Sequence, residues 1–170
     1  MVADLRVPSD VLAEEDDAQL SWKVIERAYH AVDIYDGPDV LDADLARLTP
    51  GQRALLALHW TVGEVSNGGF DQYFTNPTGV LASEALAGLR RIGASETAAL
   101  FEQLLKTFPD GEPPRDNGAR FEAVEAMRQE ADDILFEAFS DRFFDLIDSE
   151  IYPRAAAYAR AHPEEFVRTA

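Results

Sequence analysis

The sequence predicts an all-α protein that folds as one domain over residues 1–170. Ala and Leu far outnumber Val and Ile, and unbranched side chains favour helices whereas β-branched side chains suit strands. No stretch alternates apolar and polar residues with the period of two that is typical of a strand. The chain is 46% hydrophobic and no long Ser/Gly/Pro-rich linker divides it, so it can bury one sizeable core. We expect seven or eight helices packed around a central helix near residues 50–66.

The N-terminal part is predicted to hold a tail and two helices. Residues 1–18 are expected to form a loosely ordered tail. A first helix is expected at about 20–35, because apolar side chains recur along this segment at helical spacing. Gly37 and Pro38 should end that helix, since glycine frees the backbone and proline cannot continue the hydrogen-bond ladder. A short helix then follows at 40–48.

The central helix has a clear start signal. Thr49 can cap it, Pro50 suits the first helical position, and Gln52 can reach back to the backbone of the cap. Together these residues make a capping box. The helix that follows carries large apolar side chains along one face, so we expect it to be buried at the centre of the fold.

Four further helices are expected after the central one. Gly93 should stop the first of them, Ser140 or Asp141 should begin the last, and Pro153 should kink that last helix into two parts. The expected ranges are about 77–92, 96–107, 119–138 and 141–161.

The charge of the chain restricts the classes of partner. The formal net charge is -17 at pH 7, and the acidic excess lies in the outer thirds, whereas residues 51–110 are close to neutral. A field of this sign repels nucleic acid and anionic membranes and attracts basic proteins. We therefore expect no direct nucleic-acid binding and no membrane binding. The acidic surface has a simpler interpretation as well, since it promotes solubility.

The residue types also bear on chemistry and location. The chain has no cysteine, which excludes disulfides, thiolate catalysis and sulfur-ligated zinc sites. The N-terminal segment lacks the basic-then-apolar pattern of a secretory signal, and the longest apolar run is too short to cross a bilayer. The expected location is the cytoplasm.

The stretch 65–79 reads VSNGGFDQYFTNPTG. Its glycine pair, Gly68 and Gly69, comes where the central helix is expected to end, and glycine adopts a left-handed conformation there at little cost. Three aromatic residues follow at i, i+3 and i+4, on one face of a helical turn. We expect these three rings to enter the core: Phe70, Tyr73 and Phe74.

The polar residues of this stretch have structural uses as well. Asn76, which precedes a proline, can cap the next helix, and Asn67 and Gln72 can satisfy nearby backbone groups. Asp71 is the one ionisable residue between Ser66 and Gly79, and no histidine or serine accompanies it as a catalytic partner. The pattern therefore favours a structural corner over an active site.

The same stretch resembles the signature of a family of acidic, helical bacterial proteins first catalogued as a domain of unknown function, among whose members is a DNA mimic. The matching residues are Trp60, Asn67, Gly68, Gly69, Phe70, Gln72, Tyr73, Phe74 and Asn76. A DNA mimic presents carboxylates where a duplex presents phosphates. The resemblance thus implies a helical fold and a role in transcription regulation, with a basic DNA-binding protein, such as a helix-turn-helix regulator, as the partner. Mimicry itself would depend on the acidic surface rather than on the signature.

A candidate acidic surface lies near the C-terminus. If helix continues through Ser140, four acids fall at i, i+4, i+8 and i+11, on one face. Four residues of helix rise about 6 Å, which is similar to the separation of successive phosphates along one DNA strand. Two preceding aspartates extend the row. The candidate partner-binding residues are Asp132, Asp133, Glu137, Asp141, Asp145 and Asp148.

Other interpretations remain open. Charge runs are usually solvated faces, and two further acidic groups lie at 14–17 and 33–44. An immunity-type inhibitor of a basic nuclease would use the same electrostatics as a DNA mimic. A metal-dependent enzyme is the third alternative, because two helices could offer ligands to a small metal site. Its ligands would be Glu26, His30, His59 and Glu64.

The sequence nevertheless favours a protein that is not an enzyme. No HExxH motif, phosphate-binding glycine loop or GxSxG elbow is present. Nothing in the sequence assembles a nucleophile with a base and an orienting group. We therefore expect no catalytic residues, no metal and no cofactor.

Overall fold

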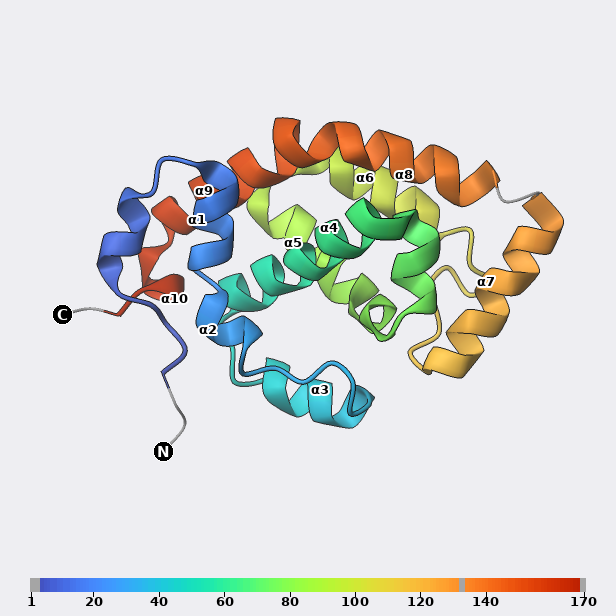
Figure 1. The fold of residues 1–170 in the computed structure, drawn as a ribbon, viewed down its shortest axis with the longest axis horizontal. Coiled ribbons are helices and arrows are strands. Elements are labelled where there is room, and N and C mark those ends of the chain that lie inside the picture. Colours follow the sequence, from blue (N-terminus) through green and yellow to red (C-terminus); the bar gives the residue numbers. More distant parts are fainter. Residues whose placement is uncertain (1–3, 132–133, 169–170) are drawn as a thin grey trace.

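A computed structural model describes residues 4–131 and 134–168, and over these ranges the chain is almost entirely helical (Figure 1). The only β interaction within these ranges is an isolated parallel bridge between Val7 and Val167. The predicted all-α class is confirmed. The α-helices are α1 (Asp17–Lys23), α2 (Glu26–Tyr29), α3 (Pro38–Leu45), α4 (Pro50–Thr75), α5 (Ala82–Ile92), α6 (Ser95–Leu105), α7 (Asn117–Ala131), α8 (Ile134–Leu146), α9 (Tyr152–Ala161) and α10 (Pro163–Phe166).

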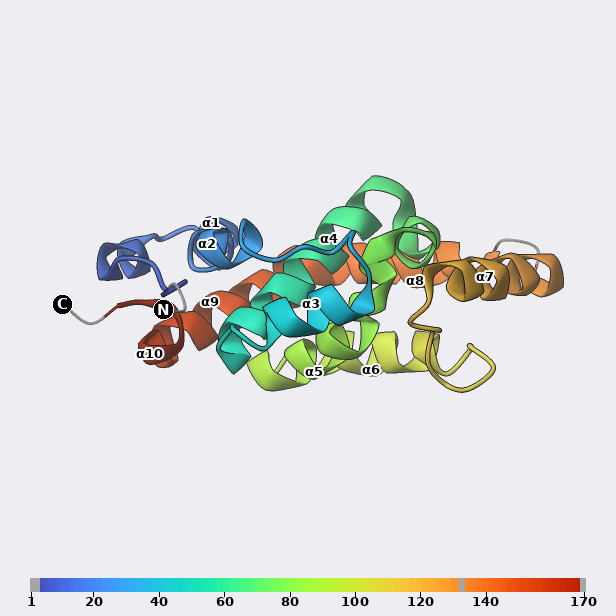
Figure 2. The same cartoon turned by 90° about the horizontal axis from the view of Figure 1, so that it is seen from below.

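Helix α4 is the centre of the fold, as predicted. It contacts α2, α5, α7, α8 and α10, and in two perpendicular views it runs through the middle of the molecule (Figures 1 and 2). The capping box at its start is present, because the Thr49 side chain accepts from the Gln52 amide and the Gln52 side chain accepts from the Thr49 amide. Leu55, Leu58 and Val65 are buried. The core therefore forms around the predicted apolar face.

The N-terminal part differs from its prediction in two respects. The helix expected at 20–35 is two short helices, α1 and α2, separated by a turn at Val24 and Ile25. Both of these residues are fully buried, so packing rather than helix continuity decides their conformation.

The described part of the segment expected as a loose tail, residues 4–18, is held to the body of the protein. Val7 is buried, its amide donates to the carbonyl of Phe166, and its carbonyl accepts from the amide of Arg168. Residues Ser9–Ala13 form a 3-10 helix, η1. Asp16 caps α1 by accepting from the Gln19 amide at 2.8 Å. Local sequence gave no sign of these contacts, because most of them join opposite ends of the chain.

The C-terminal helices also differ in their boundaries. The helix predicted at 119–138 is divided between α7 and α8, and α8 runs through Ser140 without a break. A start at Ser140 or Asp141 was therefore wrong. Helix α8 leads into η3 (Ile147–Ile151), a π-helical segment, and then into α9, with Pro153 in its first turn. Since proline donates no amide hydrogen bond, the wider π turn before it accommodates the interruption of the α-helical ladder.

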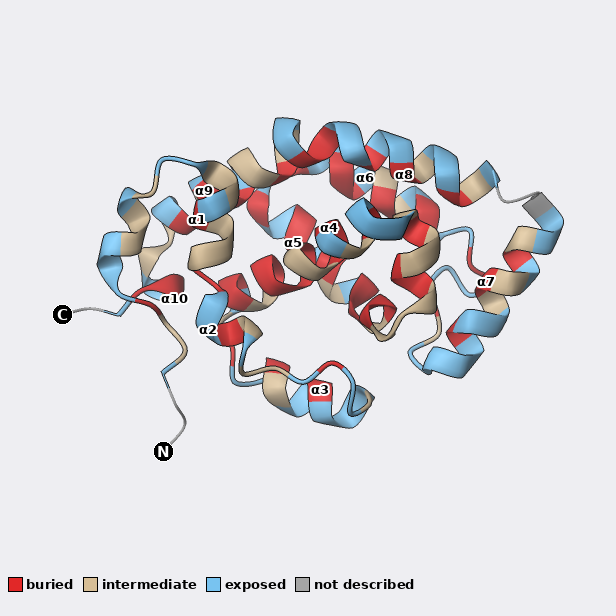
Figure 3. Ribbon diagram, viewed as in Figure 1, coloured by how far each residue is buried: buried red, intermediate tan, exposed pale blue. Residues whose placement is uncertain are grey.

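One side of α8 is buried along the length of the helix and the opposite side is exposed. Phe136, Phe143 and Leu146 are buried against the core, whereas the opposite edge of the helix is exposed (Figure 3). No helix within the described ranges is long and apolar enough to cross a membrane.

Candidate functional site

The glycine pair of the signature makes a kink inside α4. Gly69 has φ 70° and ψ -173°, a left-handed value of φ that favours glycine, while Gly68 has an extended φ of -153°. A Cβ added to Gly69 would also lie 2.8 Å from the hydroxyl oxygen of Ser140. The helix stops here as predicted, but it restarts at once and continues to Thr75.

The three aromatic residues after the kink fill the core. Phe70, Tyr73 and Phe74 are fully buried, and burial raises the pKa of the Tyr73 phenol. The Phe70 ring centroid lies 5.1 Å from that of Phe143 on α8, in an edge-on arrangement. The Phe74 ring lies 4.9 Å from that of Phe108. The expected entry of these rings into the core is confirmed.

Two polar residues of the signature contact Glu64, one of the residues considered above as a metal ligand. The side-chain amides of Gln72 and Asn76 donate to Glu64 Oε2 at 2.7 and 2.9 Å, and the Thr78 hydroxyl donates to Oε1 at 3.1 Å. These contacts differ from the prediction that Gln72 and Asn76 satisfy backbone groups. Asn76 also makes no side-chain cap for η2 (Pro77–Leu81). The carboxylate of Glu64, which precedes the kink, thus links this part of α4 to the residues that follow the kink.

Arg120 on α7 also binds the backbone of the segment that follows the kink. It is fully buried, and burial lowers the pKa of its guanidinium. It donates to carbonyl oxygens of two segments, one at the end of α4 and the other just before α7, and to one side-chain amide oxygen. Its acceptors are the carbonyls of Phe74, Asn76, Pro77, Pro114 and Arg115 and the Oδ1 of Asn117. This cation therefore satisfies backbone groups left free where α4 ends.

Ser140 joins the corner to α8. Its hydroxyl accepts from the Phe70 amide at 2.9 Å and donates to the Phe136 carbonyl at 2.6 Å. The serine therefore satisfies an amide freed by the kink while it stays within the helix, and its side chain is buried. Through this contact the signature fixes the position of α8 on the fold.

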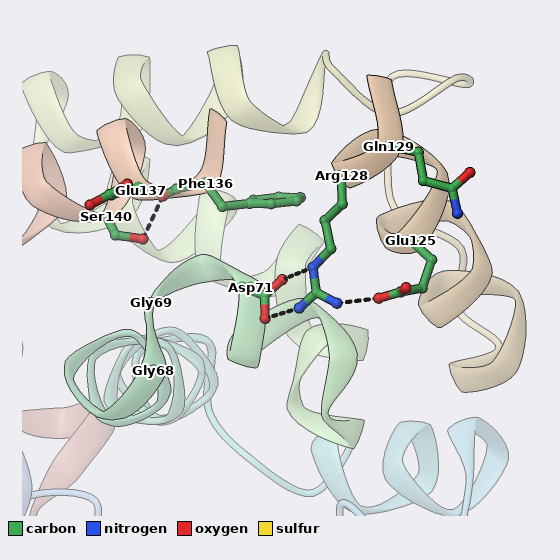
Figure 4. Close-up of a pocket in the computed structure, with 9 residues that line it drawn as sticks. All are labelled: Gly68, Gly69, Asp71, Glu125, Arg128, Gln129, Phe136, Glu137 and Ser140. Carbon is green, nitrogen blue, oxygen red and sulfur yellow. Dashed lines mark hydrogen bonds and ion pairs between the residues drawn. The ribbon is translucent and has the colours of Figure 1, made fainter. Parts of the chain in front are cut away.

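A groove opens beside the kink, between α4, α7 and α8 (Figure 4). Its volume is about 710 Å³. Arg128 lies in it and pairs with the carboxylates of Asp71 and Glu125. The groove is lined by Gly68, Gly69, Asp71, Glu125, Arg128, Gln129, Phe136, Glu137 and Ser140.

The acidic row, which runs along α8 into the start of η3, is exposed along its described length. Glu137, Asp141 and Asp148 are exposed, and within the described ranges their carboxylates make no hydrogen bond or ion pair. Asp145 is also exposed and lies 3.7 Å from Arg142. Arg142 in turn pairs with Glu96. The row is therefore a surface of largely uncompensated charge; the predicted members Asp132 and Asp133 lie outside the described residues.

The other acidic groups are largely used within the fold. Asp42 forms a bidentate pair with Arg115 at 2.7 and 3.1 Å, and these hydrogen bonds hold its pKa below the usual value. Asp44 pairs with Arg47 at 3.0 Å, and Asp33 accepts from backbone amides of its own turn. In the group at 14–17, Glu14 pairs with Lys23 and Asp17 with Arg160, and Asp16 caps α1. These acids are less available to a partner than those of α8.

The chain was compared with known proteins. A protein-family model described as DMP19-like protein matches residues 46–162. The chain belongs to the DMP19-like protein family. A search of curated proteins and a search of solved structures both return no match. The matched range begins just before α4 and ends after α9, so it contains the signature corner of this DMP19-like protein and its acidic helix.

The residues proposed as metal ligands of this DMP19-like protein serve other contacts. The His59 ring stacks on Trp22 with centroids 4.7 Å apart, and burial lowers its pKa. Glu64 holds the corner, and His30 and Glu26 are exposed on α2 and its C-terminal cap. Within the described ranges no group of three or more His, Cys, Asp or Glu residues could hold a metal ion.

The remaining signature residues lie outside the aromatic core. Trp60 is half-buried and stacks on Tyr29, with ring centroids 4.9 Å apart and planes inclined by 24°. Asn67 is exposed. Trp60 thus joins α4 to α2, whereas Asn67 faces solvent beside the kink.

Three residues that organise the site of the DMP19-like fold were missed from the sequence: Glu64, Arg120 and Ser140. A usable signal existed for two of them. Arg120 precedes the buried Val124 and Met127 at i+4 and i+7, and Ser140 stands between the buried Phe136 and Phe143. A polar residue on an apolar stripe indicates a buried hydrogen bond, because an unsatisfied polar group would be costly there.

Proposed function

We propose that this chain is an acidic protein-binding module that acts as a DNA mimic. The observation that carries the proposal is an exposed acidic row formed by Glu137, Asp141 and Asp145 on α8 and by Asp148 in the π-helical segment η3 that continues it, within a chain of net charge -17. Membership of the DMP19-like family supports it, since the family that the signature resembles includes a DNA mimic.

The spacing of the row suits this role. Successive acids four residues apart on a helix rise by about 6 Å, which is similar to the phosphate separation along one strand. A rigid scaffold keeps such a pattern in place, and α8 is held by the Ser140 hydroxyl and by the Phe70–Phe143 ring contact. A mimic of this kind engages the Lys and Arg side chains that a DNA-binding protein directs at phosphates.

The proposed partner is a basic DNA-binding protein of the helix-turn-helix type, and the proposed effect is regulation of transcription. Occupation of the DNA-binding face would release the partner from its operator. The proposed place of action is the cytoplasm, where a bacterial regulator meets DNA. An immunity-type inhibitor of a basic nuclease is the second candidate, because the same row would cover a nuclease's DNA-binding face.

The first experiment identifies the partner. The protein is immobilised and exposed to lysate of its own source cell at low and at moderate salt. A helix-turn-helix regulator that is lost as salt rises supports DNA mimicry, because screening weakens exposed charge pairs. A nuclease with the same salt dependence supports the inhibitor. Recovery of neither class at low salt would contradict both candidates.

The second experiment tests the surface. One variant neutralises the row as Glu137→Gln, Asp141→Asn, Asp145→Asn and Asp148→Asn. The control variant neutralises four other exposed acids that make no ion pair or side-chain hydrogen bond within the described ranges: Asp10, Glu15, Asp110 and Glu112. Both variants have the same net charge, so bulk electrostatics affect them equally. We expect at least tenfold weaker partner binding for the row variant than for the control. Equal loss in both variants would leave only nonspecific attraction.

A further inference from the structure

An aromatic side chain is exposed in the middle of the acidic row. Phe144 on α8 is 43% exposed, while its neighbour Phe143 is fully buried. Ile134, at the start of the same helix, is 65% exposed. A large apolar side chain in solvent has no role in the core, and together with charged neighbours it is typical of an interaction surface.

Exposed residues of α8 and of the start of η3 form a stripe. Ile134, Glu137, Asp141, Phe144 and Asp148 occupy positions i, i+3, i+7, i+10 and i+14 of the sequence. This spacing places them along one side of a helix. The stripe thus combines two apolar side chains with three acidic ones, whereas a DNA strand offers only charge at the corresponding sites.

The immediate neighbours of Phe144 on the helix surface are two carboxylates, one on α8 and the other in η3. Asp141 precedes it by three residues and Asp148 follows it by four, which are the positions that lie beside a residue on a helix. Within the described ranges neither carboxylate makes a hydrogen bond or ion pair. The nearest basic residue in sequence, Arg142, is engaged by Glu96 and Asp145.

We propose that this face of α8 binds arginine side chains of a basic partner protein, with Phe144 as the stacking platform. A guanidinium plane lies on the ring, and its N–H groups donate to Asp141 and Asp148. This inference rests on the proposed function and adds the side-chain chemistry of the partner. Arginine fits such a site better than lysine, because its planar cation stacks on aromatic rings and donates in a fixed fork to carboxylates.

The expected preference for arginine over lysine has a physical reason beyond charge. A lysine ammonium is a compact, strongly hydrated point charge. Electrostatic attraction to the carboxylates alone would therefore bind lysine as tightly as arginine. Stacking on Phe144 adds a contribution that salt screens less than the charge pairs, since part of it is contact between apolar surfaces. The site therefore retains some preference for arginine as ionic strength rises.

The test uses two peptides of equal charge, decaarginine and decalysine, titrated into the full chain by calorimetry at low and moderate salt. The wild-type protein is expected to bind decaarginine about fivefold more tightly than decalysine. Phe144→Ala should abolish that preference while leaving decalysine affinity unchanged. Phe144→Leu, which keeps an apolar side chain but removes the aromatic face, should abolish most of it, and Phe144→Tyr should retain it.

The matched control is Phe121→Ala on α7, where the ring is 47% exposed. This variant should keep the arginine preference, and circular dichroism establishes that each variant is folded. Equal binding of the two peptides, or a preference that survives Phe144→Ala, would overturn the inference and leave the proposed function standing. Absence of binding by either peptide at low salt would overturn both.

Discussion

The signature corner is joined to α8 by a hydrogen bond from the Phe70 amide to the buried Ser140, yet the corner and the outer face of that helix use polar groups in opposite ways. In the corner, both oxygens of Glu64 accept from neighbouring side chains and Arg120 donates to the backbone. On the outer face, Glu137, Asp141 and Asp148 have no such partners among the described residues.

The difference separates what holds the fold from what is available to a partner. Polar groups that are satisfied internally lower the free energy of the folded state but have little capacity left for binding. Exposed carboxylates without partners repel one another and add nothing to the fold, so their presence on one face favours a role outside it. The signature is thus the more conspicuous feature of the sequence, while the proposed function depends on the less conspicuous one.

The largest expected effect is on the aromatic core of the corner. Phe74→Ala should reduce the free energy of unfolding by about 3–5 kcal/mol, because it removes a fully buried ring. Phe121→Ala, at an exposed ring, should change it by less than about 0.5 kcal/mol. Urea denaturation of both variants measures the contrast. Wild-type stability in Phe74→Ala would show that the corner is not a stabilising element.

A smaller loss is expected at the kink. Gly69→Val should destabilise the protein by about 1–3 kcal/mol, because Gly69 has a positive φ and a Cβ would meet the Ser140 hydroxyl. Gly63→Ala, in the regular part of α4 with open space around it, should instead stabilise by about 0.5–1 kcal/mol. Thermal unfolding distinguishes the two substitutions, because the melting temperature should fall for Gly69→Val and rise for Gly63→Ala. Equal effects would mean that the kink imposes no special conformation.

Glu150, whose carboxylate is hydrogen-bonded within the fold, allows a sharper comparison with the exposed acids of the row. Glu150 accepts from the amides of Glu96 and Thr97 at the start of α6 and from the Thr97 hydroxyl. Burial opposes its ionisation, but these hydrogen bonds prevail and lower its pKa. The stabilisation from the charged form is present above the unfolded-state pKa and is lost as pH falls through the folded-state pKa. Glu150→Gln should therefore cost about 1–2 kcal/mol at pH 7 and much less near pH 3.

Denaturation curves at the two pH values provide the measurement for Glu150. The control is Glu137→Gln, whose carboxylate has no internal partner within the described ranges. Its effect on stability should be small at both pH values. A loss in Glu150→Gln that is independent of pH would show that shape, rather than charge, explains the role of this residue.

The smallest expected effect on stability is at the acidic row. The fourfold variant Glu137→Gln, Asp141→Asn, Asp145→Asn and Asp148→Asn should change the free energy of unfolding by less than about 0.5 kcal/mol, or increase it slightly as repulsion is relieved. Denaturation at low and moderate salt measures this. A loss of several kcal/mol would place these acids among the residues that hold the fold, and it would remove the contrast with the corner.

Sequence reasoning succeeded where the determining contacts are local. The Thr49–Gln52 capping box lies within a few residues, and so do the left-handed glycine at 69 and the aromatic face after it. Residues whose partners are distant in sequence were misjudged. Ser140 was considered a possible helix start because serine favours caps, but its hydroxyl is satisfied by Phe70, 70 residues earlier.

The candidate site was predictable only in part. The spacing of Glu137, Asp141, Asp145 and Asp148 is visible in the sequence, but the spacing does not tell which acids are already paired. Arg115 reaches Asp42 across 73 residues and Arg160 reaches Asp17 across 143. Such pairings depend on the tertiary arrangement, and they decide which of several acidic groups remains available.

The bridge between Val7 and Val167 has a practical consequence for the architecture. Because two backbone hydrogen bonds hold these segments side by side, a short peptide could join the first and last parts of the chain, and new ends could be opened in the exposed loop at 109–112. Such a circular permutant would keep every helix intact. Figure 1 shows α10, which is next to this bridge in the sequence, at the opposite side of the molecule from α7, so ends opened in this loop would change which part of the surface an attached label or support approaches.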